Sequence, residues 1–245
     1  MIDYLKAIDK RCSRRAYIPE LLDKDIAKKL HTFAKRYSIL SELTILLIEN
    51  DHRIFDGFLA SYGMFSGVTN YIALIGSKCD KNSFEKAGYY GEKLILDATL
   101  LNLGTCWVAG TFNKEDCKKI LGLSEEEELI SVILVGNINE QKNFKEKLIY
   151  NLVHRSTKSI KQMYTSDGAV PDWFIRGMRA VQKAPSAINK QPVKFMYQEG
   201  MVSATVPRET PYQSIDLGIA MLHFEIGAYF GKKFELIDGN YKLNS

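Results

Sequence analysis

The 245-residue sequence predicts a fold that mixes helices with strands and uses the same order of elements twice. Amphipathic segments carry apolar residues at helical spacing, which predicts helices with one buried face. Short apolar runs bounded by turn residues, such as YIALIG (71–76), are typical of buried strands. A helix–loop–strand pattern at 23–49 recurs at 172–199, so we expect two related halves in one chain.

The first half begins with an apolar stripe that predicts a short helix ending near RCSRR (11–15). Asp23 can cap the next helix, and Gly104 allows the left-handed stop of a later, longer one. In chain order, the further elements expected are helices at 23–36, 54–64, 84–103 and 114–121 and strands at 43–49, 71–76 and 129–138.

A polar stretch over 139–171 ends in YTSDGAVP (164–171), whose glycine and proline predict a linker. We therefore expect a first half over 1–163 and a shorter second half over 172–245. Besides the helix–loop–strand pattern, 214–231 resembles 91–108, because each has an acidic residue followed by an apolar helix that ends at glycine. Identity between the copies is low, and chance similarity between amphipathic helices is the alternative.

Composition places the chain among ordinary globular proteins, with 46% hydrophobic and 25% charged residues. Its longest apolar runs, including LISVILVG (129–136), are far shorter than the roughly 18 residues of a membrane-spanning helix. The N-terminus carries charges throughout and lacks the apolar core of a signal peptide. We expect a cytoplasmic protein that does not associate with membranes.

The distribution of cysteine, histidine and charge argues against several classes of site. The four cysteines form no CxxC pair, and the four histidines show no paired ligand spacing, so we expect no metal site. The net charge of +4 is mild and the basic residues are not interleaved with aromatics, so we expect no nucleic-acid binding. The commonest nucleotide-binding glycine motifs are absent from the sequence. The positive surplus instead suits a small anion.

Two segments of the first half could hold parts of such a ligand. In RCSRR, Arg11, Ser13 and Arg15 alternate, so in extended chain they can point together at a phosphate. A solvated basic surface explains three arginines in five residues equally well. In GTCWVAG (104–110), the glycines allow a sharp turn and a close backbone approach, while Trp107 forms an apolar wall. A helix end that runs into a core strand is the alternative there.

The second half contains APSAINKQPVKF (184–195), which has the composition of a stiff polar loop. Its prolines restrict the backbone, and Ser186 and Asn189 offer short donors and acceptors. Gln191 can bond either the edge of a planar ligand or the opposite backbone. The alternative is an ordinary polar turn.

These three segments together resemble the motifs of the nitroreductase-like flavoproteins. RCSRR is similar to the family's R-x-S-x-[RK], LNLGTCWVAGTF (101–112) to GLGTCWxxGF, and APSAINKQPVKF to APSxxNxQPWxF, with Val193 in place of the usual tryptophan. The resemblance covers most of the first 160 residues and 172–230. It implies an α+β sandwich with an antiparallel or mixed sheet flanked by helices, normally a homodimer with FMN at the subunit interface.

The position of the APSAINKQP segment sets this chain apart from ordinary members, which carry it shortly after the arginine motif. Here it lies in the second, shorter copy, as in the internally duplicated members of the TM nitroreductase type. The resemblance therefore implies two pseudo-symmetric halves that form an intramolecular pseudo-dimer. One half supplies the phosphate and ring-edge groups, and the other supplies the loop that the partner subunit provides in ordinary members.

The resemblance also implies which residues bind FMN. Around the phosphate these are Arg11, Ser13 and Arg15, joined by Arg155 and Lys158 of HRSTK (154–158). Around the ring, Trp107 and Val108 form a wall and the backbone N–H groups of Ala109 and Gly110 face the flavin N5. The loop contributes Pro185, Ser186, Ala187, Asn189 and Gln191. No side chain of this chain is required as an acid or base, so no catalytic residue is assigned.

The function implied is an FMN-dependent oxidoreductase that takes a hydride from NADH or NADPH and reduces a planar acceptor such as a nitroaromatic or a quinone. A non-enzymatic flavin-binding or sensing protein, and a basic interaction module without flavin, are the alternatives. Because each kind of half-site occurs once per chain, we expect one FMN per chain and a site that a monomer can complete, with higher assembly still open.

Overall fold

The computed structural model describes residues 3–51, 53, 65–108, 114–141, 147, 157–228, 234–237 and 240–244. In the first half these residues form α1 (Tyr4–Lys10), α2 (Lys24–Ser41), β1 (Thr44–Ile48), β2 (Tyr71–Ser77), α4 (Ser83–Leu100), β3 (Gly104–Val108), α5 (Lys114–Leu121) and β4 (Glu127–Gly136). The rest form η2 (Ile160–Gln162), β5 (Tyr164–Ser166), α7 (Asp172–Gln182), η3 (Ala187–Asn189), β6 (Lys194–Gln198), β7 (Met201–Thr205), α8 (Pro211–Ala228), β8 (Glu235–Ile237) and β9 (Asn240–Asn244).

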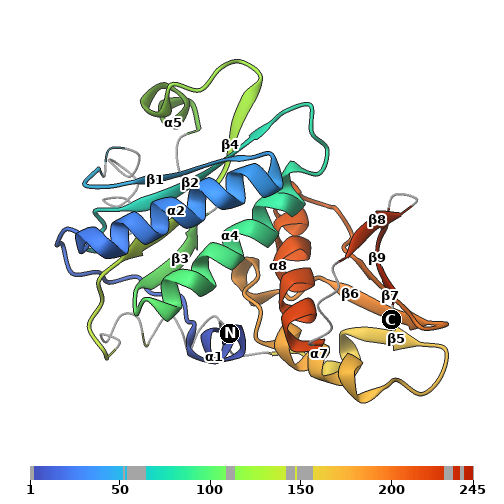
Figure 1. The fold of residues 1–245 in the computed structure, drawn as a ribbon. Helices are drawn as coiled ribbons and strands as arrows, with labels where there is room; N and C mark the ends of the chain where they lie inside the picture. The colour runs from blue at the N-terminus through green and yellow to red at the C-terminus, as the bar shows by residue number, and fades with distance from the viewer. Residues whose placement is uncertain are drawn as a thin grey trace.

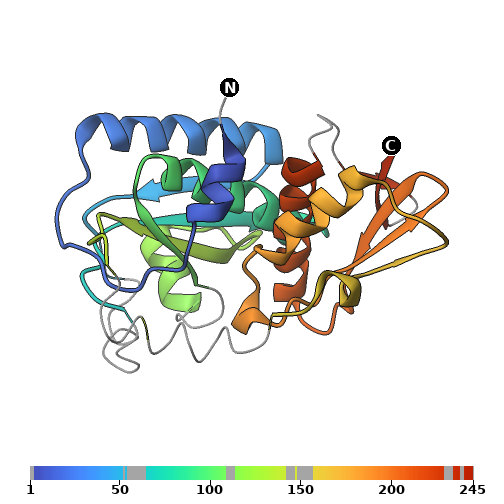
Figure 2. The ribbon, with the colours of Figure 1, turned by 90° about the horizontal axis from the view of Figure 1, so that it is seen from below.

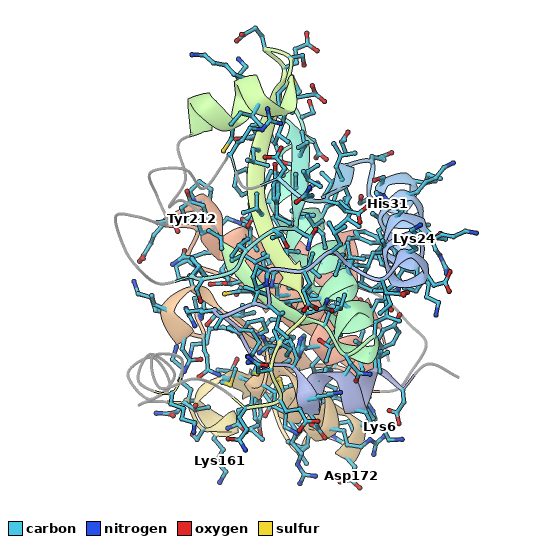
Figure 3. All side chains as sticks on the ribbon, turned by 90° about the vertical axis from the view of Figure 1, so that its left-hand side faces the viewer. Lys6, Lys24, His31, Lys161, Asp172 and Tyr212 are labelled. Carbon is cyan, nitrogen blue, oxygen red and sulfur yellow. The ribbon has the colours of Figure 1, made fainter. Side chains whose placement is uncertain are left out.

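The first sheet has the strand order β1-β2-β4-β3, and all its neighbours are antiparallel. β2 and β4 are central and almost wholly buried, as their continuous apolar sequences require. One face packs against α2 and α4 through residues such as Leu30 and Leu94, and the other face forms a separate core around Tyr71 and Val132. The polar side of α2 is exposed, and Figure 3 shows Lys24 and His31 pointing outward from it.

The second sheet has the order β5-β6-β7-β9-β8 and is mixed, since β5 pairs with β6 in parallel and the other neighbours are antiparallel. α7 and α8 pack against it through aromatic side chains: Phe174 and Phe195 each lie within 5.4 Å of Phe224, centroid to centroid. β5 occupies 164–166, which we expected to be linker, so part of that stretch belongs to a sheet. Figures 1 and 2 show helices α7 and α8 between the two sheets.

The two halves meet where α4 crosses α8, and two glycines allow this crossing to be close. A Cβ atom on Gly88 would lie 2.1 Å from the carbonyl oxygen of Ile215, and one on Gly218 would lie 2.0 Å from that of Glu85. Each helix thus presents a glycine to the backbone of the other. This reciprocity is what a two-fold relation between the halves would produce, and the duplication and its boundaries stay predictions.

The observed architecture confirms the α+β class with antiparallel and mixed sheets flanked by helices. The helices expected near the N-terminus and at 23–36, 84–103 and 114–121 are present, and the three expected strands are present within two residues of their predicted ends. The expected stop at Gly104 is wrong: α4 ends at Leu100, the left-handed residue after it is Asn102 (φ 63°), and Gly104 begins β3. The helix expected at 54–64 lies outside the described residues. Within the described part of the chain, no helix is both long and apolar enough to cross a membrane.

Candidate functional site

A pocket of about 550 Å³ lies at the junction of the two halves, within the range typical of small-molecule sites. The first half lines it with the chain that follows α1 and with the end of β3. The second half lines it with the end of α7, the loop over 184–189 and the first turns of α8. The two segments that the sequence separates by more than 160 residues therefore share one cavity.

The RCSRR segment leaves α1 at Arg11, the C-cap residue, whose N–H donates to the carbonyl oxygen of Ala7. It then runs beside β3, where Ser13 pairs with Thr105 in a parallel bridge and Arg14 N donates to Thr105 O over 2.8 Å. This extended course produces the predicted alternation. Arg11, Ser13 and Arg15 line the pocket, whereas Arg14 is buried outside it and donates to the carbonyl oxygen of Asn139.

The two pocket arginines lie in different surroundings. The Arg11 side chain is only 10% exposed, and its Nε lies 3.5 Å from Oε1 of Glu92 without a hydrogen bond to any described residue. The Arg15 guanidinium lies 6.0 Å from the centroid of the Phe65 ring, close enough for a cation–π interaction. Two guanidinium groups in its lining make the pocket suited to an anion.

Glu92 joins the pocket wall to the helices behind it. Its Oε2 accepts a 2.8 Å hydrogen bond from Trp107 Nε1, and its Oε1 lies 3.0 Å from His223 Nε2. The other ring nitrogen of His223 lies 3.1 Å from the carbonyl oxygen of Ala180. Both ring nitrogens of His223 therefore lie within hydrogen-bond distance of an oxygen atom. This buried group holds Trp107 and Arg11 in fixed positions on the same side of the pocket.

The APSAINK loop is tied down at both ends. Ser186 Oγ accepts from Gln191 N over 2.9 Å, and Ala187 N donates to Asp216 Oδ1 of α8 over 3.0 Å. Between these bonds the backbone takes the left-handed conformation at Ile188 (φ 46°) and Asn189 (φ 55°), which is costly for residues other than glycine. The loop is therefore held in one shape, with Pro185, Ser186, Ala187, Ile188 and Asn189 lining the pocket.

Gln191 and Lys158 do not line this pocket and instead bond to each other. Gln191 Oε1 accepts from Lys158 N, and Lys158 Nζ donates to the carbonyl oxygen of Gln191, both over 2.8 Å. Gln191 Nε2 also donates to Gln182 O over 3.1 Å. Of the two partners expected for Gln191, the edge of a ligand or the opposite backbone, the structure shows the backbone. Gln191 and Lys158 therefore hold the loop in place without lining the pocket. Ala109, Gly110 and Arg155 lie outside the described residues.

Three kinds of lining residue were not expected from the sequence. Tyr212, which Figure 3 shows at the start of α8, and Ile215 and Ile219 add an apolar face. Asp9 and Lys183 form an ion pair at the rim that joins α1 to the end of α7. Asp216 is buried, and burial raises its pKa to about 7 although the Ala187 N–H opposes the rise. The signal available in the sequence was an acidic residue directly before the apolar run LGIAML (217–222).

Comparison with known proteins gives a consistent result. A family model described as "Putative TM nitroreductase" matches residues 3–228. A "putative nitroreductase" from Thermotoga maritima is 19% identical, with a TM-score of 0.66, and the match covers 99% of this chain and 94% of that one.

Two further structures match 69% of this chain. A "Putative NADH dehydrogenase/NAD(P)H nitroreductase" from Parabacteroides distasonis is 19% identical, has a TM-score of 0.52 and is matched over 100% of its length. A nitroreductase family protein from Clostridium difficile is 17% identical, has a TM-score of 0.51 and is matched over 99% of its length. At these identities the similarity shows a shared fold. No curated protein matches the chain.

Proposed function

Because this chain belongs to the family described as "Putative TM nitroreductase", we propose that it is an FMN-dependent oxidoreductase that uses NADH or NADPH to reduce a small planar acceptor. One observation carries the proposal. A single pocket joins Arg11, Ser13 and Arg15 of one half to the APSAIN loop of the other. The lining of that pocket offers guanidinium groups that suit a phosphate and apolar surface that suits a planar ring.

The phosphate of FMN fits the end formed by the RCSRR segment. A dianionic phosphate needs charge-assisted donors, and Arg11 and Arg15 supply two guanidinium groups with the Ser13 hydroxyl between them. The buried Nε of Arg11 faces Oε1 of Glu92 at 3.5 Å, and this ion pair would fix the position of the guanidinium group. The pair of pocket arginines would hold and neutralise the phosphate, and Glu92 would keep Arg11 from turning away.

The flavin ring would lie between β3, the loop and α8. Trp107, Val108 and Ile219 supply apolar surface, and Ser186 and Asn189 supply polar groups at the loop. Gly91 allows this wall to pack closely, since a Cβ there would lie 2.5 Å from the Trp107 ring. A rigid, mostly apolar slot with few polar groups would orient a planar ring and exclude water from its face.

When bound, FMN would supply the two-electron chemistry, accepting a hydride from a nicotinamide and passing it to a second substrate. The chain's own residues would bind and orient the ligands. Positive charge at Arg11 and Arg15 would also favour a ligand that gains negative charge on reduction. The apolar surface at Tyr212 and Ile188 would accommodate flat acceptors such as nitroaromatics and quinones.

The test begins with the purified protein mixed with FMN and separated from the unbound fraction. We expect the retained protein to show the visible bands of oxidised flavin, to lose them under anaerobic NADH or NADPH, and to regain them when a quinone or a nitroaromatic is added. A protein that retains no FMN would contradict the proposal. Retained FMN that neither nicotinamide reduces would identify a flavin-binding protein without this activity.

A further inference from the structure

We propose that Asp216 is a hydrogen-bond donor of the pocket: a protonated carboxyl group that binds an acceptor atom of the planar ligand beside the APSAINK loop. The inference rests on the proposed function, because it concerns the flavin ring that the same pocket would hold. It assigns a role to a residue outside the three segments that resemble family motifs.

The geometry gives the two carboxyl oxygens of Asp216 different surroundings. Oδ1 accepts a 3.0 Å hydrogen bond from Ala187 N and so fixes the carboxyl group against the loop. Oδ2 makes no hydrogen bond with the described residues. It is also not one of the unpartnered polar atoms that the protein encloses completely, so it keeps some accessible surface. Asp216 lines both this pocket and a neighbouring cavity of about 10 Å³, and the pocket is the larger of the two and can hold a ligand. Oδ2 is therefore the carboxyl oxygen that can meet a ligand.

The surroundings of Asp216 do not provide a cation to balance a carboxylate. Asp216 is 5% exposed, and no described residue forms an ion pair with it. The charged or titratable groups on neighbouring elements have other partners: Glu85 with Arg208, Tyr89 with Glu225, Lys183 with Asp9, and Glu92 with His223 and Arg11. Burial without a counter-ion favours the neutral acid, and the pKa of Asp216 accordingly rises to about 7.

A neutral carboxyl group at this place selects its ligand by chemistry. It donates through Oδ2–H to a carbonyl oxygen, a nitro oxygen or an unprotonated ring nitrogen, all of which occur on flavins, quinones and nitroaromatics. A ligand with a carboxylate at this position would meet a carboxyl group that ionises near neutral pH, and the two negative charges would repel. Asp216 therefore favours neutral planar ligands at this end and makes their binding weaker as it ionises.

The substitution Asp216→Asn separates the donor from the charge. The asparagine oxygen still accepts from Ala187 N, and its NH₂ group donates at every pH. The FMN dissociation constant of both proteins is measured by quenching of flavin fluorescence from pH 5.5 to pH 8.5. We expect the ratio of the wild-type constant to that of Asp216→Asn to rise by about three- to tenfold over this range, because the wild type loses one hydrogen bond. Taking the ratio of the two proteins cancels the titration of the FMN phosphate itself. Asp167→Asn, in an exposed loop outside the pocket, should follow the wild type.

Stability of the protein without FMN gives a second readout. An Asp with a pKa of 3.8 in the unfolded chain and about 7 in the folded one binds more protons when folded between these values. The free energy of unfolding therefore falls as pH rises from about 4 to about 7, and Asp216→Asn lacks this part of the pH dependence. Urea unfolding of both proteins at a series of pH values measures the difference.

The possible outcomes separate this inference from the proposed function. FMN binding by both proteins with a constant ratio of dissociation constants overturns the role of Asp216 and leaves the flavoprotein intact. A carbon-13 NMR signal showing Asp216 ionised at pH 6 in the FMN complex overturns it as well. Failure of both proteins to bind FMN at any pH overturns the proposed function and this inference together.

Discussion

At the scale of single residues, the alternation in RCSRR decides which of its side chains line the pocket. The bridge between Ser13 and Thr105 holds this segment in extended form, so Arg11 and Arg15 share a side that Arg14 does not. A basic cluster on a helix would have spread these side chains around its axis. Arg11 and Arg15 can therefore face the same ligand only because the helix ends at Lys10.

The first prediction concerns these arginines. Arg11→Ala or Arg15→Ala should weaken FMN binding by about 1.5–3 kcal/mol, the usual worth of a hydrogen bond to a charged group. Isothermal titration of FMN into each variant measures the loss. Arg179→Ala removes the same charge from an exposed position of α7 outside the pocket and should bind like the wild type. Unchanged affinity in both pocket variants would remove RCSRR from the site.

The second prediction concerns the strained backbone of the loop. Ile188 is 73% exposed and left-handed, so Ile188→Gly gives up little burial and relieves strain. The free energy of unfolding should stay equal or rise by up to about 1 kcal/mol, because the relief exceeds the entropy that glycine adds to the unfolded chain.

Ile39→Gly is the matched control, because Ile39 is 72% exposed but lies within α2. There glycine should lower the free energy of unfolding by about 0.5 kcal/mol. Urea unfolding compares the two variants. An equal loss in both would show that the conformation of Ile188 carries no strain.

The residues that local sequence places in the candidate site could be predicted, whereas residues whose role depends on distant contacts could not. Local chain geometry suffices to place Arg11, Ser13 and Arg15, since their alternation is a property of five consecutive residues. Asp216 acquires its character from burial and from Ala187, almost thirty residues away, and neither is visible locally. Gln191 and Lys158 matched motif positions, yet their bonds to each other depend on how two distant segments meet.

Among the secondary-structure elements, the crossing of α4 and α8 determines where the halves meet and therefore where the pocket lies. The first turns of α8 line the pocket, and Glu92 of α4 contacts both Trp107 of its wall and His223 of α8. Any change in the distance between these helices should therefore alter both stability and the pocket.

The third prediction tests this crossing. In Gly218→Ala the new Cβ would lie 2.0 Å from Glu85 O and 2.7 Å from Tyr89 N, both backbone atoms that cannot rotate away. The helices must separate, which should lower the free energy of unfolding by about 1–3 kcal/mol and weaken FMN binding. Gly168→Ala, whose Cβ would have no neighbour within 4 Å, should stay within about 0.5 kcal/mol of the wild type. Equal stability of the two variants would argue against the close crossing.

Sequence patterns predicted most of the elements because β2, β4 and the amphipathic helices carry strong local signals. The assignment of 164–166 to a linker missed β5, since a three-residue strand with two exposed positions has no periodic signal of its own. Its structure comes from pairing with β6, and that pairing depends on the fold of the second half.

In the whole molecule, the two halves contribute different segments to the pocket, although their order of elements is similar. The arginine segment belongs to the first half and the APSAINK loop to the second, and both line the same pocket. The ion pair between Asp9 and Lys183 joins the halves at the rim of this pocket. One chain therefore brings both segments to a single pocket, as the proposed site requires.

The most direct test of this account is the amount of FMN bound per chain together with the mass of the particle that binds it. FMN released on denaturation gives the first quantity, and light scattering during size-exclusion chromatography gives the second. We predict one FMN per 27.9 kDa chain, retained when the protein is diluted to a monomer. Two FMN per chain would contradict the asymmetry of the site. Loss of FMN whenever the protein becomes monomeric would show that the site is shared between chains.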